Sequence, residues 1–119
     1  MRLRHVPRGQ EADEGRILAN QVEVADTVLA KLRGLAFRDV PDDFALVFEF
    51  GSPGYRSIHM LFVRESLDVI WLYDGAVRKR QTLAPWTGFG IARADRVIEL
   101  PAGAATGVDP GDEVRIEMD

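Results

Sequence analysis

Apolar side chains are most concentrated in the middle of the chain, in Ile58–Tyr73 (IHMLFVRESLDVIWLY). The pattern divides this segment into two predicted strands, Arg56–Val63 and Leu67–Tyr73, with a polar interruption at Arg64–Ser66. Both faces of the second strand are apolar except for Asp68, which is typical of a central strand covered on both sides. We therefore expect the segment to form the centre of the core and to adjoin any functional site.

Shorter apolar runs on either side predict further strands at close spacing. In residues 16–25, Val22 and Val24 alternate with Gln21 and Glu23, which fits a half-buried strand. Similar patterns predict strands at Arg2–Val6, Phe44–Phe50, Ala76–Leu83, Arg96–Leu100 and Glu113–Glu117. The Gly and Pro residues of Gly51–Gly54 are expected to end the strand that precedes them.

Turn and cap residues set the limits of these elements. Asp74-Gly75 tolerates positive φ and predicts a two-residue hairpin. Asp109–Asp112 fits a type II turn, because Pro stands second and Gly third. One short helix is predicted over Thr27–Arg33, since an Asp or Thr can cap its start and Gly34 can end it in a left-handed conformation.

The close strand spacing and the hairpin turns predict a β-rich α+β fold. Its sheet is expected to be mostly antiparallel and barrel-like or sandwich-like, with one or two short helices. The small, Gly- and Ala-rich Pro101–Gly107 is the second place where a helical turn fits. At 119 residues, with no linker and no internal repeat, the chain is expected to be a single domain over residues 1–119.

The amino-acid composition limits the kinds of functional site and partner that we expect. The chain has no cysteine, which excludes disulfides and thiolate catalysis, and only two histidines, so neither a metal site nor a cofactor is expected. A net charge of −4 with dispersed acids argues against nucleic acid as a partner. Without an apolar run of about 18 residues or an apolar signal-peptide core, we expect a cytoplasmic protein that has no membrane partner. We expect it to be a monomer or a weak homodimer.

Two polar residues of the central segment are candidates for chemistry. Asp68 lies between apolar neighbours, so its carboxylate must be partnered or protonated. It is either a structural group that accepts backbone N–H donors or a binding or acid–base group. His59 is either a core or rim histidine or a residue that works beside Asp68. The structural interpretation is favoured for both, because no nucleophile motif completes a triad.

Two aromatic residues stand in the Gly- and Pro-containing loop Ala84–Gly90. Trp86 and Phe89 can cap the core, form the wall of a small-ligand site or contact a partner, and core capping is favoured. The candidate ligand-binding residues are therefore His59, Asp68, Trp86 and Phe89. No catalytic residue is nominated.

Several short motifs occur in a recognisable order. An Ala-Asp-Thr precedes the predicted helix (Ala25–Thr27), and a Gly-Leu-x-x-Arg follows it (Gly34–Arg38). The central motif joins Met60 to a Leu-Asp at positions 67 and 68, and Val-x-Glu-Leu-x-x-Gly (Val97–Gly103) and a Gly-Asp come last. Over about residues 16–117 this order resembles the widespread family of domains of unknown function numbered 192.

The central motif also departs from that family's pattern, which reads Trp-Met-Lys-Asn-Thr and, after two residues, Pro-Leu-Asp. His59 stands in place of the Trp, Leu61–Val63 replace Lys-Asn-Thr, and Ser66 replaces the Pro. Asp68 keeps the pattern. The resemblance implies a compact β-rich α+β domain and implies no reaction, because the family is uncharacterised.

These observations favour a small domain that binds a small molecule or a protein partner without catalysis. The alternatives are a hydrolase-like enzyme that uses His59 with Asp68, and a structural or regulatory interaction protein that uses the aromatic loop. If His59 and Asp68 line one concave site, the binding or enzyme hypothesis gains. If both are sealed in the core, the interaction hypothesis gains.

Overall fold

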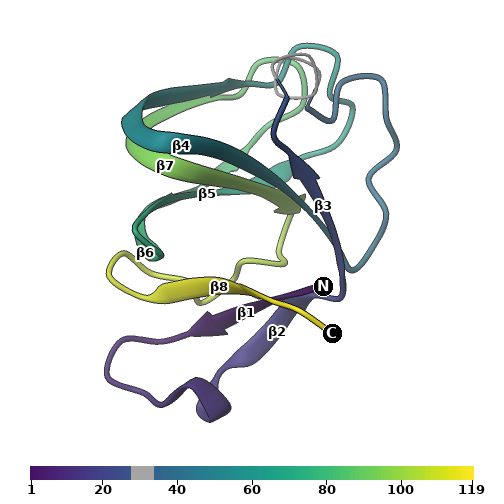
Figure 1. Ribbon diagram of the computed structural model, residues 1–119. Helices are drawn as coiled ribbons and strands as arrows, with labels where there is room; N and C mark the ends of the chain where they lie inside the picture. The colour runs from purple at the N-terminus through teal and green to yellow at the C-terminus, as the bar shows by residue number, and fades with distance from the viewer. Residues whose placement is uncertain (28–33) are drawn as a thin grey trace.

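A computed structural model describes residues 1–27 and 34–119 (Figure 1). These residues form one sheet of eight strands in the order β2-β1-β8-β6-β5-β7-β4-β3. The strands are β1 (Arg2–Val6), β2 (Arg16–Ala19), β3 (Gln21–Ala25), β4 (Phe44–His59), β5 (Leu67–Tyr73), β6 (Ala76–Leu83), β7 (Phe89–Pro101) and β8 (Glu113–Glu117). The predicted helix falls on residues 28–33 and lies outside the described residues.

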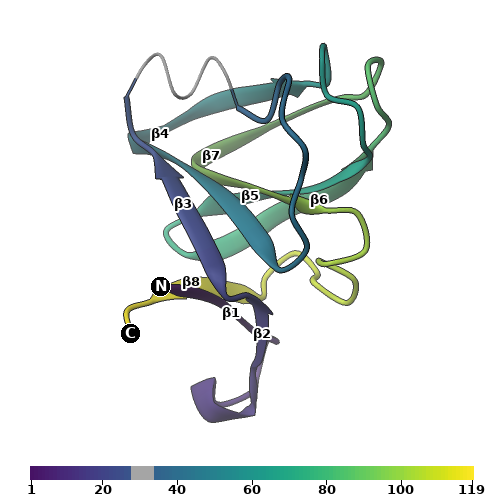
Figure 2. The ribbon, with the colours of Figure 1, turned by 90° about the vertical axis from the view of Figure 1, so that its right-hand side faces the viewer.

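The sheet is antiparallel except where β3 runs parallel to β4. Its edge strands β2 and β3 follow each other in the chain, with only Asn20 between them. Figure 2 shows the resulting curl, with β1, β2 and β8 lying below the strongly curved β4 and β7. The prediction of a β-rich, mostly antiparallel sheet is thus confirmed.

The helical part of the α+β prediction has little support in the part of the chain that the structure describes. There the only helix is the three-residue 3-10 helix η1 (Ala12–Glu14). In the segment Pro101–Gly107, Pro101 ends β7 and residues 102–107 form successive turns instead of a helical turn, which suits a segment with two glycines at positive φ, Gly103 and Gly107. Among residues 1–27 and 34–119, no helix is long and apolar enough to cross a membrane.

The central strand is β5, as its apolar pattern predicts. It pairs with β6 on one side and β7 on the other, and its residues are buried except for the half-exposed Tyr73. Asp74 and Gly75 then turn the chain with φ values of 50° and 81°. This pair of positive φ angles confirms the predicted two-residue hairpin, because such turns match the twist of the strands.

Strand β4 differs from the prediction, because it does not end at Gly51–Gly54. It continues to His59, and its register against β7 shifts between Glu49 and Gly54. An irregularity of this kind bends a strand without ending it, and Gly51 takes a φ of 75° there. Strand β7 is correspondingly longer than the predicted Arg96–Leu100, since it pairs with both halves of β4.

Alternation along the central strands divides the buried side chains between two clusters. The first is built around the larger side chains Leu46, Phe48, Met60, Val69, Trp71 and Val97. The second contains Leu3, Val47, Ile70, Leu72, Ile98 and Leu100. Successive residues of β5 and β7 thus point into opposite clusters, which we call core 1 and core 2 in this order.

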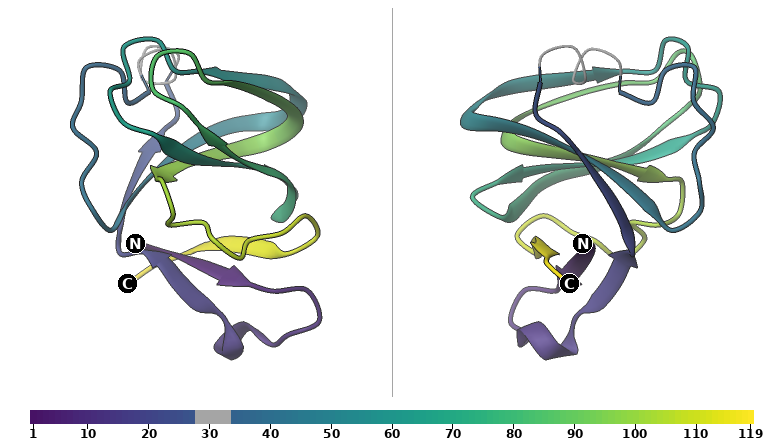
Figure 3. Two further views of the ribbon diagram at one scale, coloured as in Figure 1. Left: turned by 180° about the vertical axis from the view of Figure 1, so that it is seen from behind. Right: turned by 45° about the vertical axis from the view of Figure 1, so that its right-hand side comes forward.

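The first and last strands close the molecule beneath core 2. Strand β1 pairs with β8 over its whole length, and Figure 3 shows the two termini side by side. His5 Nε2 lies 2.8 Å from Asp112 Oδ2 inside this pairing, and both side chains are buried. Burial alone raises the pKa of Asp112, but hydrogen bonds from His5 and from the backbone N–H groups of Asp109 and Arg8 lower it below its usual value.

Candidate functional site

The most unusual polar residue of the structure is Glu99, on β7. It pairs with Val69 of β5 and Leu46 of β4, so its side chain points into core 1. Only 4% of the residue is exposed, and its Oε1 has no hydrogen-bond partner among the described residues. Burial raises the pKa of Glu99 from 4.5 to about 7, because the charged form loses its hydration.

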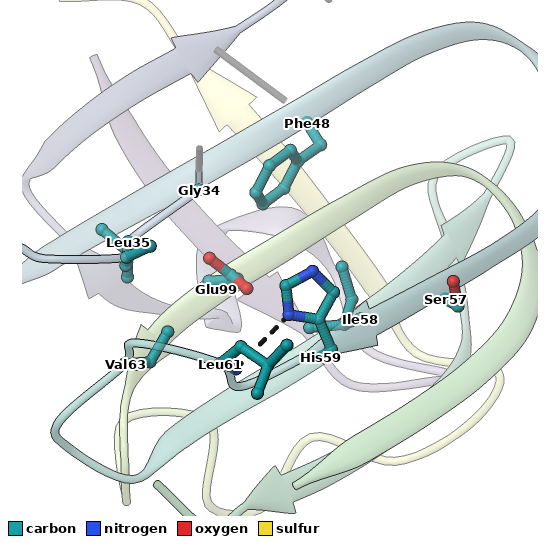
Figure 4. Close-up of a pocket in the computed structure, with 10 residues that line it drawn as sticks. Gly34, Leu35, Phe48, Ser57, Ile58, His59, Leu61, Val63 and Glu99 are labelled. Atoms are coloured by element: carbon teal, nitrogen blue, oxygen red, sulfur yellow. Dashed lines mark hydrogen bonds between the residues drawn. The ribbon is translucent and has the colours of Figure 1, made fainter. Parts of the chain in front are cut away.

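Glu99 lies at a hollow of about 70 Å³ that opens between β4, β7 and two loops (Figure 4). Figure 4 shows its carboxylate and the imidazole of His59 facing the same space. The hollow is lined by Gly34, Leu35, Ala36, Phe48, Ser57, Ile58, His59, Leu61, Val63 and Glu99. A site of this size has room for about two water molecules, which is far less than a drug-sized ligand needs.

His59 stands at the rim, because β4 ends there. Its side chain is exposed, and the backbone N–H of Leu61 donates to its Nδ1 at 3.3 Å. The register between β4 and β7 places His59 directly opposite Phe89. Gly34 forms the opposite wall with a φ of 51°, the left-handed conformation expected of it, and a Cβ there would lie 3.5 Å from Glu99 Oε1.

Three loops are tied together beside the hollow by backbone hydrogen bonds. The N–H of Phe37 donates to the carbonyl of Phe62 at 2.9 Å, and that of Trp86 donates to the carbonyl of Val63 at 3.2 Å. The N–H of Met60 donates to the carbonyl of Gly88 at 3.1 Å. These bonds fix the loops at one end of the sheet (Figure 2).

Each of these loops presents one exposed aromatic side chain, and together we call Phe37, Phe62 and Trp86 the aromatic platform. The rings of Phe37 and Phe62 stack at 4.6 Å, and Trp86 meets Phe62 edge-on at 5.3 Å. Their φ angles are 62°, 64° and 66°, in the left-handed region. Such a conformation costs roughly 1–3 kcal/mol for each residue that has a side chain, and it is concentrated at functional sites.

Asp68, the other carboxylate of interest, has a different environment. It lies on β5 opposite Leu100, so it points to the side of core 2. Its Oδ2 accepts the backbone N–H groups of Gly103 and Ala105, both at 2.9 Å, and its Oδ1 accepts the hydroxyl of Thr82 at 2.7 Å. Asp68 thus attaches the turns after β7 to the sheet, as its structural interpretation predicts.

The structure brings only part of the predicted set together. His59 lines the hollow, Phe89 lies next to it on β7, and Trp86 belongs to the neighbouring platform. Asp68 does not line the hollow and lies on the other side of the central strands. Trp86 and Phe89 are about half exposed, so neither is sealed in the core.

Sequence reasoning missed Glu99, although a signal for it exists. In the predicted strand Arg96–Leu100, alternation places Glu99 on the same side as the apolar Val97. A glutamate in line with core residues is as unusual as Asp68, and it also occupies the Glu position of the motif over Val97–Gly103.

The arrangement is suited to hold a hydrogen-bond donor or a small cation against Glu99. A buried carboxylate without a partner is stabilised when such a group reaches it. Within the described ranges, no three His, Asp or Glu side chains are grouped so as to hold a metal ion.

Comparison with known proteins gives consistent matches over most of the chain. The family model DUF192, described as Uncharacterized ACR, matches residues 10–116. A UPF0127 protein of Thermococcus sibiricus is 32% identical over 114 residues, covering 89% of this chain and 72% of the relative. A UPF0127 protein of Pyrococcus horikoshii is 31% identical over 99 residues, covering 80% and 86%.

Two solved structures share the fold. A candidate transcription regulator from Sinorhizobium meliloti has a TM-score of 0.82 and 24% identity, with 96% of this chain and 91% of that chain covered. A protein of unknown function from Novosphingobium aromaticivorans has a TM-score of 0.78 and 21% identity, with coverages of 98% and 84%. At these identities the likeness concerns the fold alone.

Proposed function

Because this chain belongs to the DUF192 family, whose description names no activity, we propose from its geometry that it is a small binding domain. The hollow beside Glu99 receives one polar group of a small molecule or of a protein partner. The observation that carries this proposal is Glu99 itself, a buried carboxylate whose Oε1 has no partner among the residues described.

The free-energy cost of burying the Glu99 carboxylate supports a binding site for a hydrogen-bond donor. Burying a carboxylate without hydrogen bonds destabilises the folded chain, and a bound donor or cation offsets that penalty. Binding at Glu99 therefore couples directly to stability, because a ligand that binds only the folded state raises its stability by mass action.

The two alternative functions have unequal support. A hydrolase that pairs His59 with Asp68 has little, since the Asp68 carboxylate already accepts three hydrogen bonds. An interaction protein gains support from the aromatic platform, and it is compatible with a binding hollow. A protein partner is therefore one form of the proposed function.

A ligand-detected NMR screen of small polar fragments tests the proposal. We expect hits that carry an ammonium, amidinium or amide donor, and we expect the Glu99→Gln variant to lose them. His59→Ala should weaken them, because His59 forms the rim. Glu113→Gln is the matched control, since Glu113 is on β8 and does not line the hollow. A set of hits that survives Glu99→Gln unchanged would remove the proposed site.

A further inference from the structure

The aromatic platform is an exposed apolar surface. Phe37 is 71% exposed, and Phe62 and Trp86 are exposed by more than two-fifths. All three residues have left-handed backbone conformations, which are concentrated at functional sites. An exposed apolar surface of this kind is suited to contact another molecule.

The platform and the hollow are two parts of one surface. Leu35 and Ala36, which line the hollow, directly precede Phe37 in the chain. Leu61 and Val63, which also line it, stand on either side of Phe62. A group that enters the hollow therefore leaves the rest of its molecule beside the platform.

The charge inside the hollow favours a basic partner. Glu99 is the one acid among the described residues that line it, and its Oε1 has no partner among the described residues. The two arginines of the neighbouring loops are already paired, Arg38 with Glu23 at 2.8 Å and Arg64 with Asp39 at 2.9 Å. The carboxylate of Glu99 therefore attracts and orients a cationic group that enters the hollow.

The size of the hollow selects among cations. About 70 Å³ corresponds to about two water molecules, which matches an ammonium group and the methylene that carries it. A guanidinium has four heavy atoms in a plane and presents a fork suited to two acceptor oxygens. A single carboxylate in a narrow space is better matched by the compact ammonium.

We infer that the partner is a protein segment that inserts a lysine side chain into the hollow beside Glu99 and lays neighbouring apolar residues on the aromatic platform. This inference rests on the proposed function and specifies its ligand. The lysine supplies a donor to Glu99 Oε1, which has no partner among the described residues, and the apolar neighbours cover Phe37, Phe62 and Trp86. Cation–π attraction to Trp86 assists the approach of the ammonium.

A peptide titration followed by ¹H–¹⁵N NMR tests the inference. The probes are blocked pentapeptides of sequence Gly-Leu-Lys-Phe-Gly, the same peptide with norleucine or arginine in the centre, and butylammonium chloride. We expect the lysine peptide to bind at least tenfold more tightly than either analogue and than butylammonium. Shifts should centre on the hollow and the platform.

Substitutions test the contributions of the hollow and of the aromatic platform to peptide binding separately. Glu99→Gln should weaken the lysine peptide at least tenfold, and Trp86→Ala should weaken it severalfold. Tyr55→Ala is the matched control, because Tyr55 is a highly exposed aromatic of β4 outside the platform and the hollow. It should leave affinity unchanged. The NMR spectrum of each free variant confirms that it is folded.

The outcomes separate this inference from the proposed function. If butylammonium binds in a Glu99-dependent way but the peptide gains nothing and Trp86→Ala has no effect, the ligand is a small amine and the inference is wrong. If norleucine or arginine binds as well as lysine, the inference is also wrong. If no probe and no fragment depends on Glu99, the proposed function fails together with it.

Discussion

The central strands β5 and β7 each carry one buried carboxylate, and the two have opposite environments. Asp68, on the core 2 side, accepts three hydrogen bonds and holds the turns after β7 against the sheet. Glu99, on the core 1 side, has an Oε1 without a partner among the described residues and borders a hollow. Asp68 therefore fastens loops over its side of the sheet, which we call the closed side. Glu99 borders a hollow on its side, which we call the open side.

The difference shows that burial of a carboxylate does not by itself indicate a site. Three donors around Asp68 replace the hydrogen bonds to water that its burial removes, so its side chain serves the structure. Among the described residues no donor reaches Glu99 Oε1, and the loops beside it hold exposed aromatics with left-handed backbone. The partner count of a buried acid, more than its depth, distinguishes a structural group from a candidate binding group.

The largest change in stability is expected for a substitution of Asp68, on the closed side. Asp68→Ala leaves the Gly103 and Ala105 N–H groups and the Thr82 hydroxyl without their acceptor, at about 1–3 kcal/mol for each buried group that stays unpaired. We expect a loss of about 4 kcal/mol in the free energy of unfolding, measured by urea denaturation.

A second aspartate provides the control for that loss. Asp95→Ala removes a half-buried carboxylate that accepts from the backbone N–H of Asp74, and it should change stability by less than about 1 kcal/mol. Equal effects of the two substitutions would show that Asp68 does not hold the turns.

The next effect, on the open side, depends on pH. Burial raises the pKa of Glu99 from 4.5 to about 7, so the folded chain holds a proton that the unfolded chain releases in this range. The contribution of Glu99 to stability is therefore lost as pH rises, by about 2–3 kcal/mol between pH 5 and pH 8. Glu99→Gln cannot ionise and removes this loss.

This pH-dependent loss of stability is measured by parallel urea denaturations of the wild type and Glu99→Gln at pH 5, 6, 7 and 8. The variant should gain stability relative to the wild type as pH increases, and the gain should level off above pH 7. At each pH, the difference between the two free energies of unfolding is compared, because the contributions of the other titrating groups cancel in that difference. A difference that is flat across this range contradicts an uncompensated Glu99.

A smaller effect is expected on the aromatic platform. Phe37→Asn removes a large aromatic side chain, yet Phe37 is mostly exposed and asparagine tolerates its left-handed backbone. The lost stacking on Phe62 and the relieved strain oppose each other, so stability should change by less than about 1 kcal/mol. A loss of several kcal/mol in thermal or urea unfolding would make the platform a part of the core.

The smallest effect is expected for the ion pair at the edge of the platform. Arg64 and Asp39 are 2.9 Å apart, but both side chains are strongly exposed. Water and salt screen such pairs. Asp39→Asn should therefore leave the melting temperature unchanged at both low and high salt, and a clear salt-dependent loss would contradict this.

The sequence predicted the strands best where local patterns and tertiary pairing agree. Arg2–Val6, Leu67–Tyr73, Ala76–Leu83 and Glu113–Glu117 all match observed strands. The Asp74-Gly75 hairpin and the resemblance to the family of domains of unknown function are likewise confirmed. Such elements are short, and a turn residue or an alternation marks each of their limits.

The prediction failed where a long-range partner overrides a local signal. Gly51–Gly54 contains the residues that usually end a strand, yet β4 continues to His59 because β7 pairs with both halves. Residues 16–25, expected as one strand, form β2 and β3 on opposite edges of the sheet. Neither result can be read from a window of ten residues.

The site was predicted in part for a related reason. His59, Trp86 and Phe89 drew attention because they are polar or aromatic in unusual places, and they lie near one end of the sheet. Asp68 was singled out by its apolar neighbours, but these neighbours cannot show how many donors face it. For Glu99, the alternation of Arg96–Leu100 cannot show that Leu46 and Val69 lie on either side of it in the sheet.

The pairing of β1 with β8 has a consequence for synthesis. Leu3 lies opposite Ile116, so the first strand of these 119 residues completes the sheet only when the last one has been made. At about 5–20 residues per second, the ribosome leaves β1 without β8 for on the order of ten seconds. During that interval β1 can pair with β2 but has one unpaired edge, and its alternating Arg2 and Arg4 help to keep that edge from pairing with other chains.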